Sequence, residues 1–240
     1  MRTHDEEVYL VENRYEAPKS IHLFLISELL RVWKSDESIL DVGCAAGELL
    51  FNINKMVPGV QRMYGEDVID SLLEKASAAV PNACFKNFDC SSREFDQGVK
   101  VGYVICSDVL GIFDDHLLIL DNLLSRVKCG GYLFVTWIFN DFDVDVWVRY
   151  KDYFRHADER REAGWNIFGK PGISRWLEER KDVASHSFKP FYMDKDLPMR
   201  PTDPARCWTF KSENGDRITR NGLNLIADDS LLIIKKIGRF

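Results

Sequence analysis

The fold of this chain is decided by one short stretch, Ser38-Ile39-Leu40-Asp41-Val42-Gly43-Cys44-Ala45-Ala46-Gly47. It begins as a compact apolar run, which is typical of a buried strand, and ends in a turn rich in glycine and alanine. Residues 48–56 then carry a helical pattern. Small residues let the backbone turn sharply and pass close to a ligand. The stretch therefore predicts a strand, a turn suited to ligand binding and a helix.

The alternation of strand and helix continues along the chain. Further strands are expected at 61–66, 83–88, 101–106, 132–139, 186–192 and 231–237, with a hairpin over 206–211 and 217–220. Further helices are expected at 21–33, 69–80, 117–127 and 171–183. Such alternation predicts an α/β fold, a doubly wound and mostly parallel sheet with helices on both faces. Ligands of these sheets bind beyond the carboxyl ends of the strands.

Composition excludes several classes of function. The 240 residues include 32 Lys and Arg against 38 Asp and Glu, a net charge of −6, and no basic patch, so no nucleic-acid partner is expected. No apolar run approaches the roughly 20 residues of a bilayer span, so no membrane span is expected. The six cysteines lack zinc-site spacing. Scattered cysteines favour a reducing compartment, and we expect a cytoplasmic protein.

An acidic residue stands at or directly after the end of each of three successive predicted strands. Asp41 precedes the glycine turn, Asp67 follows it by about 20 residues, with Glu66 as an alternative register, and Asp89 comes after 83–88. In these residues the chain resembles the class I S-adenosylmethionine-dependent methyltransferases, whose first strand ends in Asp-x-Gly-x-Gly-x-Gly. Ala45 stands at the middle glycine of that motif.

The resemblance implies S-adenosyl-L-methionine as cofactor and S-adenosyl-L-homocysteine as product. Asp41 would accept hydrogen bonds from the methionine ammonium or its water, and Asp67 would bind both ribose hydroxyls. Asp89 would accept from the adenine amine, and the Cys90 backbone N–H would donate to the base. The other cofactor-binding residues that the resemblance implies are Gly43, Cys44, Ala45, Gly47, Val68, Phe88 and Ser107.

The resemblance also completes the predicted fold. It implies seven strands, the last of them antiparallel, with insertions after strands five and six. One methyltransferase domain would span 1–240, with an N-terminal arm and helix at 1–37 and a cofactor-binding core at 38–139. The insertions, 140–170 and 193–229, would lie on the acceptor side, because both connections fall at the ligand end of the sheet.

Two alternatives stay open. A nicotinamide-dependent oxidoreductase also needs glycines after the first strand and an acid after the second. Its pattern would require glycine at position 45 and glycine or alanine at position 48, where this chain has Ala45 and Glu48. A member of the methyltransferase fold without catalytic activity is the other alternative, because Gly102 stands where many members carry aspartate.

The acceptor is expected to be a small molecule or a glycan. The segment after the fourth strand lacks the Asn/Asp-Pro-Pro-aromatic signature of nucleic-acid amino-methyltransferases. Residues 140–147, 164–168 and 206–209 resemble methyltransferases of bacterial surface-polysaccharide biosynthesis, which implies methylation of a sugar hydroxyl. Aromatic and polar side chains in the insertions suit such a ligand, although the helical spacing of Trp147, Tyr150 and Phe154 favours core packing.

Proton removal from a hydroxyl calls for a general base. His116 is the first candidate, because an imidazole titrates near neutrality, and Asp108 and His156 are the others. No metal is expected. A magnesium site from Asp108, Asn140 and Asp141 stays open, whereas a calcium loop over 141–152 is excluded, because valine occupies its glycine position and aspartate its last. The oligomeric state is left open.

Overall fold

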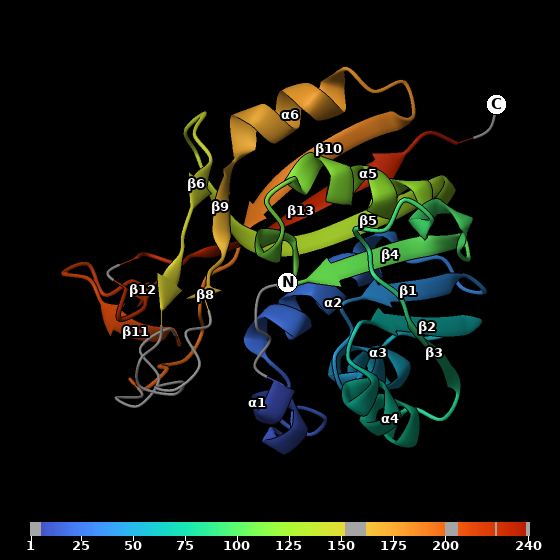
Figure 1. Cartoon of the computed structure of the whole chain (residues 1–240), viewed down its shortest axis with the longest axis horizontal. Helices are drawn as coiled ribbons and strands as arrows, with labels where there is room; N and C mark the ends of the chain where they lie inside the picture. Colours follow the sequence, from blue (N-terminus) through green and yellow to red (C-terminus); the bar gives the residue numbers. More distant parts are fainter. Residues whose placement is uncertain (1–5, 152–161, 200–205, 224, 239–240) are drawn as a thin grey trace.

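The computed structural model describes residues 6–151, 162–199, 206–223 and 225–238. Its central sheet has the strand order β10-β13-β5-β4-β1-β2-β3 (Figure 1). The bounds of these strands are β1 Ser38–Val42, β2 Arg62–Asp67, β3 Ala83–Asn87, β4 Val101–Ser107, β5 Val127–Asn140, β10 Val183–Pro190 and β13 Asp229–Lys236. The pairs from β3 across to β5 are parallel, whereas β13 runs antiparallel to both β5 and β10. The predicted fold class is confirmed.

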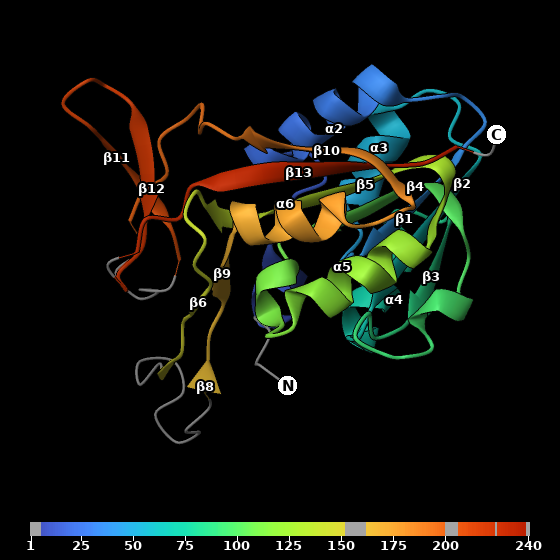
Figure 2. The same cartoon turned by 90° about the horizontal axis from the view of Figure 1, so that it is seen from above.

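Helices cover both faces of the sheet (Figure 2). α2 (Ser20–Val32) and α3 (Glu48–Met56) pack on one face, and α5 (His116–Ser125) and α6 (Lys170–Glu178) pack on the other. α4 (Asp70–Ala79) packs on β2 and β3. Because both faces are covered, every residue of β1 is buried, and three of its five residues are Ile, Leu or Val.

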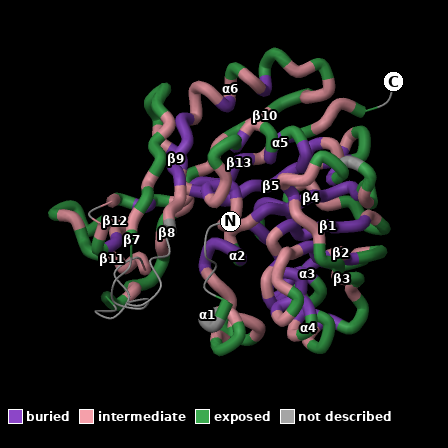
Figure 3. The backbone as a smooth tube through the Cα atoms, in the orientation of Figure 1, coloured by how far each residue is buried: buried purple, intermediate pink, exposed green. Residues whose placement is uncertain are grey.

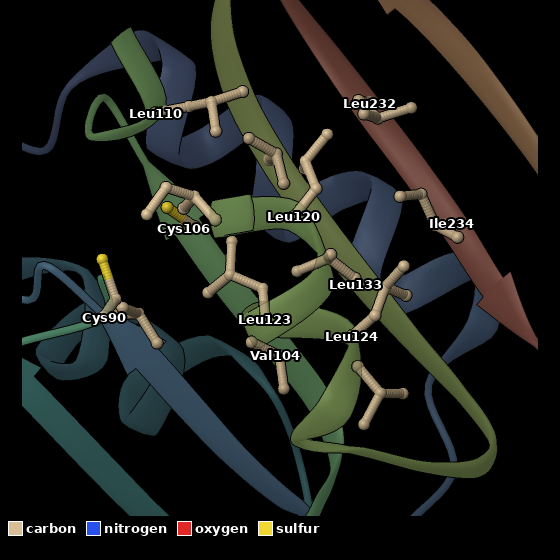
Figure 4. Packing of buried hydrophobic residues seen from close by; sticks show 14 of the residues in the cluster. Cys90, Val104, Cys106, Leu110, Leu120, Leu123, Leu124, Leu133, Leu232 and Ile234 are labelled. Atoms are coloured by element: carbon tan, nitrogen blue, oxygen red, sulfur yellow. The ribbon is translucent and has the colours of Figure 1, made fainter. Parts of the chain in front are cut away.

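The two halves of the core follow the alternation of side chains along each strand. In β1, Ile39 joins the cluster beneath α2 and α3, whereas Leu40 joins the cluster beneath α5 and α6. Figure 4 shows Leu120, Leu123 and Leu124 of α5 among the side chains of β4, β5 and β13. The buried backbone is concentrated in these central strands (Figure 3).

Several elements differ from the sequence predictions. The N-terminal arm contains a short helix, α1 (Glu6–Val11), which packs on α4. β5 begins at Val127, ahead of the predicted start at 132. Within it, Gly131 lies so close to β4 that a Cβ there would meet the Gly102 carbonyl oxygen at 2.3 Å. α5 and α6 end two and five residues before their predicted last residues, 127 and 183. Two 3-10 turns, Phe95–Gln97 and Leu110–Ile112, were not predicted.

The insertions form small strands beyond the carboxyl ends of β4 and β5 (Figure 1). Their bounds are β6 Val146–Trp147, β7 Tyr150–Lys151, β8 Glu162–Ala163, β9 Asn166–Gly169, β11 Trp208–Lys211 and β12 Arg217–Arg220. β9 pairs with both β5 and β6, and β11 pairs with β12 as the predicted hairpin. In the described ranges, no helix is long and apolar enough to cross a bilayer.

The prediction that Trp147 is a core residue is wrong. The backbone there is a strand, and the Trp147 side chain is 53% exposed. Tyr150 lies in β7 and is partly buried, and Phe154 falls outside the described residues. A spacing of three and four residues buries one face only when the segment is helical.

Candidate active site

A cavity of about 360 Å³ opens at the carboxyl ends of β1, β2 and β4. It is lined by ten of the eleven residues expected to bind the cofactor: Asp41, Gly43, Cys44, Ala45, Asp67, Val68, Phe88, Asp89, Cys90 and Ser107. Gly47 is not among its lining residues. It precedes α3 at φ +75°, where a Cβ would lie 2.9 Å from the Cβ of Ala76. Gly47 therefore allows close packing of α3 on α4.

The glycine turn has a conformation that only small residues tolerate. Gly43 has φ +75°, and a Cβ there would lie 2.3 Å from Cγ2 of Val109. Ala45 has φ +45° despite its side chain, which accounts for the glycine that the motif prefers at this position. The backbone N–H groups of Gly43 and Cys44 donate to the Glu66 carbonyl and fix the turn against β2.

The two acids that end β2 have different surroundings. Asp67 lines the cavity and accepts hydrogen bonds from the backbone N–H groups of Ala45, Val68 and Ile69. Glu66 is buried and accepts hydrogen bonds from the guanidinium of Arg126 at 2.8 and 3.3 Å. Of the two acids, Asp67 is therefore the one that lines the cavity, and its role in binding the ribose remains a prediction.

Asp41 is a buried acid in the same cavity, 2% exposed. Burial and the negative charge of Asp67 raise the pKa of Asp41 to about 7. A cation bound beside these two carboxylates would favour their ionised forms. The cavity is thus electrostatically suited to a positively charged ligand.

The segment after β3 forms the next part of the wall. Asp89 accepts hydrogen bonds from the backbone N–H and hydroxyl of Ser91, so its carboxylate also fixes a local turn. Lys86 Nζ lies 4.6 Å from the centre of the Phe88 ring. Burial raises the pKa of the Cys90 thiol to about 12, which keeps it neutral.

Three lining residues come from the N-terminal part of the chain, Tyr9, Lys19 and His22, and the sequence analysis missed them. Burial and the positive charge of Lys19 lower the pKa of His22 to about 3, so its imidazole is neutral. The buried Nδ1 of His22 has no hydrogen-bond partner among the described residues. In the sequence, this region is recognisable only as the start of a helix after Pro18, and no pattern in it indicates a binding site.

Lys19 forms an ion pair with Asp108, with Nζ 3.2 Å from Oδ2. Although burial opposes a charge on Lys19, the Asp108 carboxylate holds the pKa of Lys19 above its usual value. Asp108 also accepts a hydrogen bond from the Thr136 hydroxyl at 3.2 Å, and its backbone has φ +60°. Such conformations are uncommon for residues other than glycine and cluster at functional sites.

Among the described residues, a second cavity of about 410 Å³ shares only Lys19 and Asp108 with the first. Its described lining comes from the N-terminal segment, the ends of β4 and β10, both insertions and β13: Arg14, Lys19, Ser20, Ile21, Asp108, Tyr150, Trp165, Phe191, Met193, Lys195, Leu197, Pro198, Arg206, Cys207 and Asp229. Burial and the negative charge of Asp108 raise the pKa of Asp229 to about 8. Two carboxylates and one ammonium therefore meet where the cavities adjoin.

The candidate bases are separated by the structure. Asp108 lines both cavities, whereas His116 is among the lining residues of neither. The His116 ring stacks on Phe168, with ring centres 4.0 Å apart, and burial lowers its pKa. Its catalytic role remains a prediction, and His156 lies outside the described residues.

The residues considered for magnesium have other partners. Asn140 donates to the Val144 carbonyl and accepts from the Phe142 N–H, and Asp141 forms an ion pair with Lys170. In the described part of the chain, no group of three or more His, Cys, Asp or Glu side chains has an arrangement that could hold a metal ion.

Comparison with known proteins identifies the family. A family model described as a methyltransferase domain matches residues 12–180, and the chain belongs to this family. The enzyme is therefore an S-adenosylmethionine-dependent methyltransferase, and the nicotinamide-dependent alternative does not hold. A comparison with curated proteins gave no match.

Solved structures share the fold at low sequence identity. A structure of the complex between the Haloferax volcanii Trm112 methyltransferase activator and a methyltransferase matches with 15% identity and a TM-score of 0.60, covering 95% of this chain and 94% of that one. The S-adenosylmethionine-dependent methyltransferase of Clostridium acetobutylicum matches with 14% identity, a TM-score of 0.56 and coverages of 98% and 96%. The N-methyltransferase NodS of Bradyrhizobium japonicum, solved with S-adenosyl-L-homocysteine, matches with 15% identity, a TM-score of 0.52 and coverages of 98% and 93%.

The first cavity carries acidic groups of the kind expected for this cofactor. Two of its acids, the buried Asp41 and the half-buried Asp67, suit a cationic ligand with an ammonium and hydroxyl groups. The absence of a side chain at Gly43 lets Val109 pack directly against the turn.

Proposed function

We propose that the protein methylates a hydroxyl group of a small polyhydroxylated acceptor, such as a sugar, bound in the second cavity. One observation carries the proposal. The ion pair of Lys19 with Asp108 lines both cavities, so a ligand on each side would meet at this pair. Methyl transfer requires that the two reactants be held in contact while water is excluded.

The first cavity would hold the cofactor through the residues that line it. Asp41 would bind the ammonium, Asp67 the ribose hydroxyls, and Asp89 and Cys90 the adenine, with Phe88 beside the base. When bound, S-adenosylmethionine supplies a methyl group on a positively charged sulfur. Gly43, Cys44, Ala45, Val68 and Ser107 would complete the cofactor site.

Asp108 would accept the proton of the acceptor hydroxyl. Lys19 fixes one oxygen of its carboxylate and Thr136 the other, which holds the group in one orientation. The ammonium of Lys19 would also stabilise negative charge that develops on the acceptor oxygen. Asp229, whose pKa of about 8 favours its protonated form at neutral pH, would donate a hydrogen bond to the acceptor.

The aromatic residues of the second cavity support a sugar-like acceptor. Tyr150 and Trp165 line it beside charged and hydroxyl-bearing side chains. Flat apolar rings next to directional polar groups provide both stacking and orientation for a ring with many hydroxyls. The resemblance of the insertions to enzymes of surface-polysaccharide biosynthesis favours the same class of acceptor.

Transfer of a labelled methyl group to a panel of sugars, nucleotide sugars and oligosaccharides tests the proposal. We expect label in a product whose methyl group is attached through oxygen, as determined by mass spectrometry and NMR. Incorporation only into amines, or only into nucleic acid, would contradict it.

Asp67→Asn is expected to weaken binding of S-adenosyl-L-homocysteine by roughly 10-fold to 100-fold, because hydrogen bonds to a charged group contribute about 1.5 to 3 kcal/mol. Isothermal titration calorimetry measures the effect. Glu74→Gln, an exposed acid on α4, is the matched control and should bind like the wild type. Thermal unfolding of both variants shows whether the turn at Ala45 has been lost. Wild-type affinity in Asp67→Asn would remove this residue from the cofactor site.

Asp229→Asn is expected to stabilise the protein at pH 8 while lowering turnover. The folded-state pKa of about 8 exceeds the unfolded value near 3.9, so the contribution of Asp229 to stability falls as the pH rises between these values. Asparagine removes this penalty, which is on the order of 5 kcal/mol at pH 8 and about 1 kcal/mol at pH 5. Scanning calorimetry should therefore show a rise in Tm at both pH values, and a rise several times larger at pH 8. Glu213→Gln, an exposed acid, should show no such difference.

A further inference from the structure

The second cavity has an excess of positive charge in its described lining, although the whole chain carries a net charge of −6. Four cationic side chains line it: Arg14, Lys19, Lys195 and Arg206. The acidic side chains that line it are Asp108 and Asp229. Cations from the arm and from the second insertion thus converge on one cavity of a chain that is acidic as a whole.

The two arginines lie close enough to share one carboxylate. Arg14 donates to both oxygens of Glu12 at 3.1 Å, and Nη1 of Arg206 lies 3.9 Å from Oε1 of the same group. Although burial favours the neutral acid, Arg14, Arg206 and Lys19 hold the pKa of Glu12 below its usual value. Several cations therefore surround a single carboxylate, and this carboxylate is not among the lining residues of the cavity.

The acidic lining compensates only part of this charge. Asp108 is already paired with Lys19. Asp229 lies near Asp108, and two close carboxylates in a partly buried site do not readily ionise together. Glu12 offsets one of the remaining charges, so among the described residues Arg14, Lys195 and Arg206 still give the outer part of the cavity a net positive charge.

We propose that the acceptor carries an anionic group, a phosphate or a carboxylate, which binds to Arg14 and Arg206 in the second cavity while its hydroxyl faces the pair of Lys19 and Asp108. This inference rests on the proposed function, because it assigns the same cavity to the acceptor. The planar guanidinium donates two parallel hydrogen bonds to a carboxylate or phosphate and so fixes orientation as well as charge. Arg14 and Arg206, called the anchor below, would place one hydroxyl of the acceptor ring next to Lys19 and Asp108, although the ring carries several similar hydroxyls.

The anchor also counteracts the electrostatic repulsion between an anionic acceptor and the acidic protein. An anionic acceptor is repelled by an acidic protein surface, and a cavity lined by cations attracts it locally and raises its rate of entry. Tyr150 and Trp165 would contact the ring of the acceptor between the anchor and the reacting hydroxyl. The described lining therefore selects an anionic sugar derivative over a neutral sugar.

Calorimetric titration of the protein saturated with S-adenosyl-L-homocysteine tests the proposal. The probes are glucose 1-phosphate, glucuronate and neutral glucose, at low ionic strength and again at 0.5 M salt. We expect at least one anionic probe to bind tenfold or more tightly than glucose, and the added salt to weaken that binding. The two anionic probes distinguish a phosphate from a carboxylate.

Variants of the anchor complete the test. Arg206→Gln and Arg14→Gln should each weaken the anionic probe about tenfold or more and leave binding of S-adenosyl-L-homocysteine within about twofold. Arg206→Lys should retain more affinity than Arg206→Gln. Arg175→Gln is the control and should change neither affinity, because Arg175 is an exposed residue of α6 that pairs with Asp143.

Two outcomes would overturn the inference. One is equal binding of glucose and both anionic probes, and the other is undiminished anion binding in Arg14→Gln and Arg206→Gln that remain folded by thermal unfolding. Failure of the wild type to transfer a methyl group to any hydroxyl, despite normal binding of S-adenosyl-L-homocysteine, would instead contradict the proposed function. The two failures are therefore distinguishable.

Discussion

Asp108→Asn is expected to lower turnover by about 10² to 10⁴, the usual contribution of a general base, with little change in the affinity for S-adenosyl-L-homocysteine. Asparagine is nearly the same shape as aspartate and tolerates the left-handed backbone at φ +60°, so the substitution removes basicity without straining the turn. The amide retains one oxygen for Lys19 or Thr136. Single-turnover kinetics with the acceptor in excess measures the chemical step.

His116→Ala is the informative comparison. If His116 acts only through packing on Phe168, this variant lowers Tm but keeps the pH dependence of the wild-type rate. A base at Asp108 predicts that Asp108→Asn slows the chemical step and that His116→Ala does not. A large loss in His116→Ala together with near-normal turnover in Asp108→Asn would assign the base to His116 instead.

The cofactor half of the site could be predicted because its residues follow the strands directly. Asp41, Asp67 and Asp89 each stand where a predicted strand ends, and parallel strands bring their carboxyl ends to one edge of the sheet. Only the order of strands and the small residues of the turn were needed. The physical constraint is local in sequence, so a single chain was enough to recognise it.

The acceptor half could not be predicted in the same way. Lys19 and Asp108 are 89 positions apart and meet only when the arm folds over the carboxyl end of β4. Asp229 is brought to them by the antiparallel pairing of β13 with β5. Asp108 follows the fourth strand and could be proposed as a base, but Lys19 and Asp229 lie in no pattern with a fixed spacing, and the chemistry of the three residues arises from mutual burial and charge.

One departure from the family pattern also has a physical reason. Gly102, where many members carry aspartate, lies under the side chain of Glu37, and a Cβ there would be 2.7 Å from Glu37 Oε2. Glu37 in turn pairs with Lys128. The position is at the start of β4, away from the carboxyl ends of the strands, so the glycine affects packing there and is no argument against catalysis.

Arg126→Met is expected to destabilise the fold by about 3 to 5 kcal/mol, because it leaves Glu66 as a buried charge without its partner. Arg126 is fully buried and also donates to the carbonyls of Phe95 and Val99, which would lose these hydrogen bonds. For a chain of this length each kcal/mol corresponds to roughly 2 to 4 °C, so Tm should fall by roughly 6 to 20 °C. Thermal and urea unfolding measure the loss.

The double variant Glu66→Gln with Arg126→Met separates the charge from the lost packing. Removing both charges should recover part of the stability, because the cost of a broken buried pair arises mainly from the ion that remains. Arg175→Met, which breaks the exposed pair with Asp143, should leave Tm nearly unchanged, because solvent screens such pairs.

Since Glu66 precedes Asp67 and its carbonyl fixes the glycine turn, Arg126→Met should also weaken S-adenosyl-L-homocysteine binding. An Arg126→Met variant as stable as the wild type would mean that water or a structural shift stabilises the unpaired carboxylate of Glu66. In that case the ion pair of Arg126 with Glu66 does not hold the glycine turn in place.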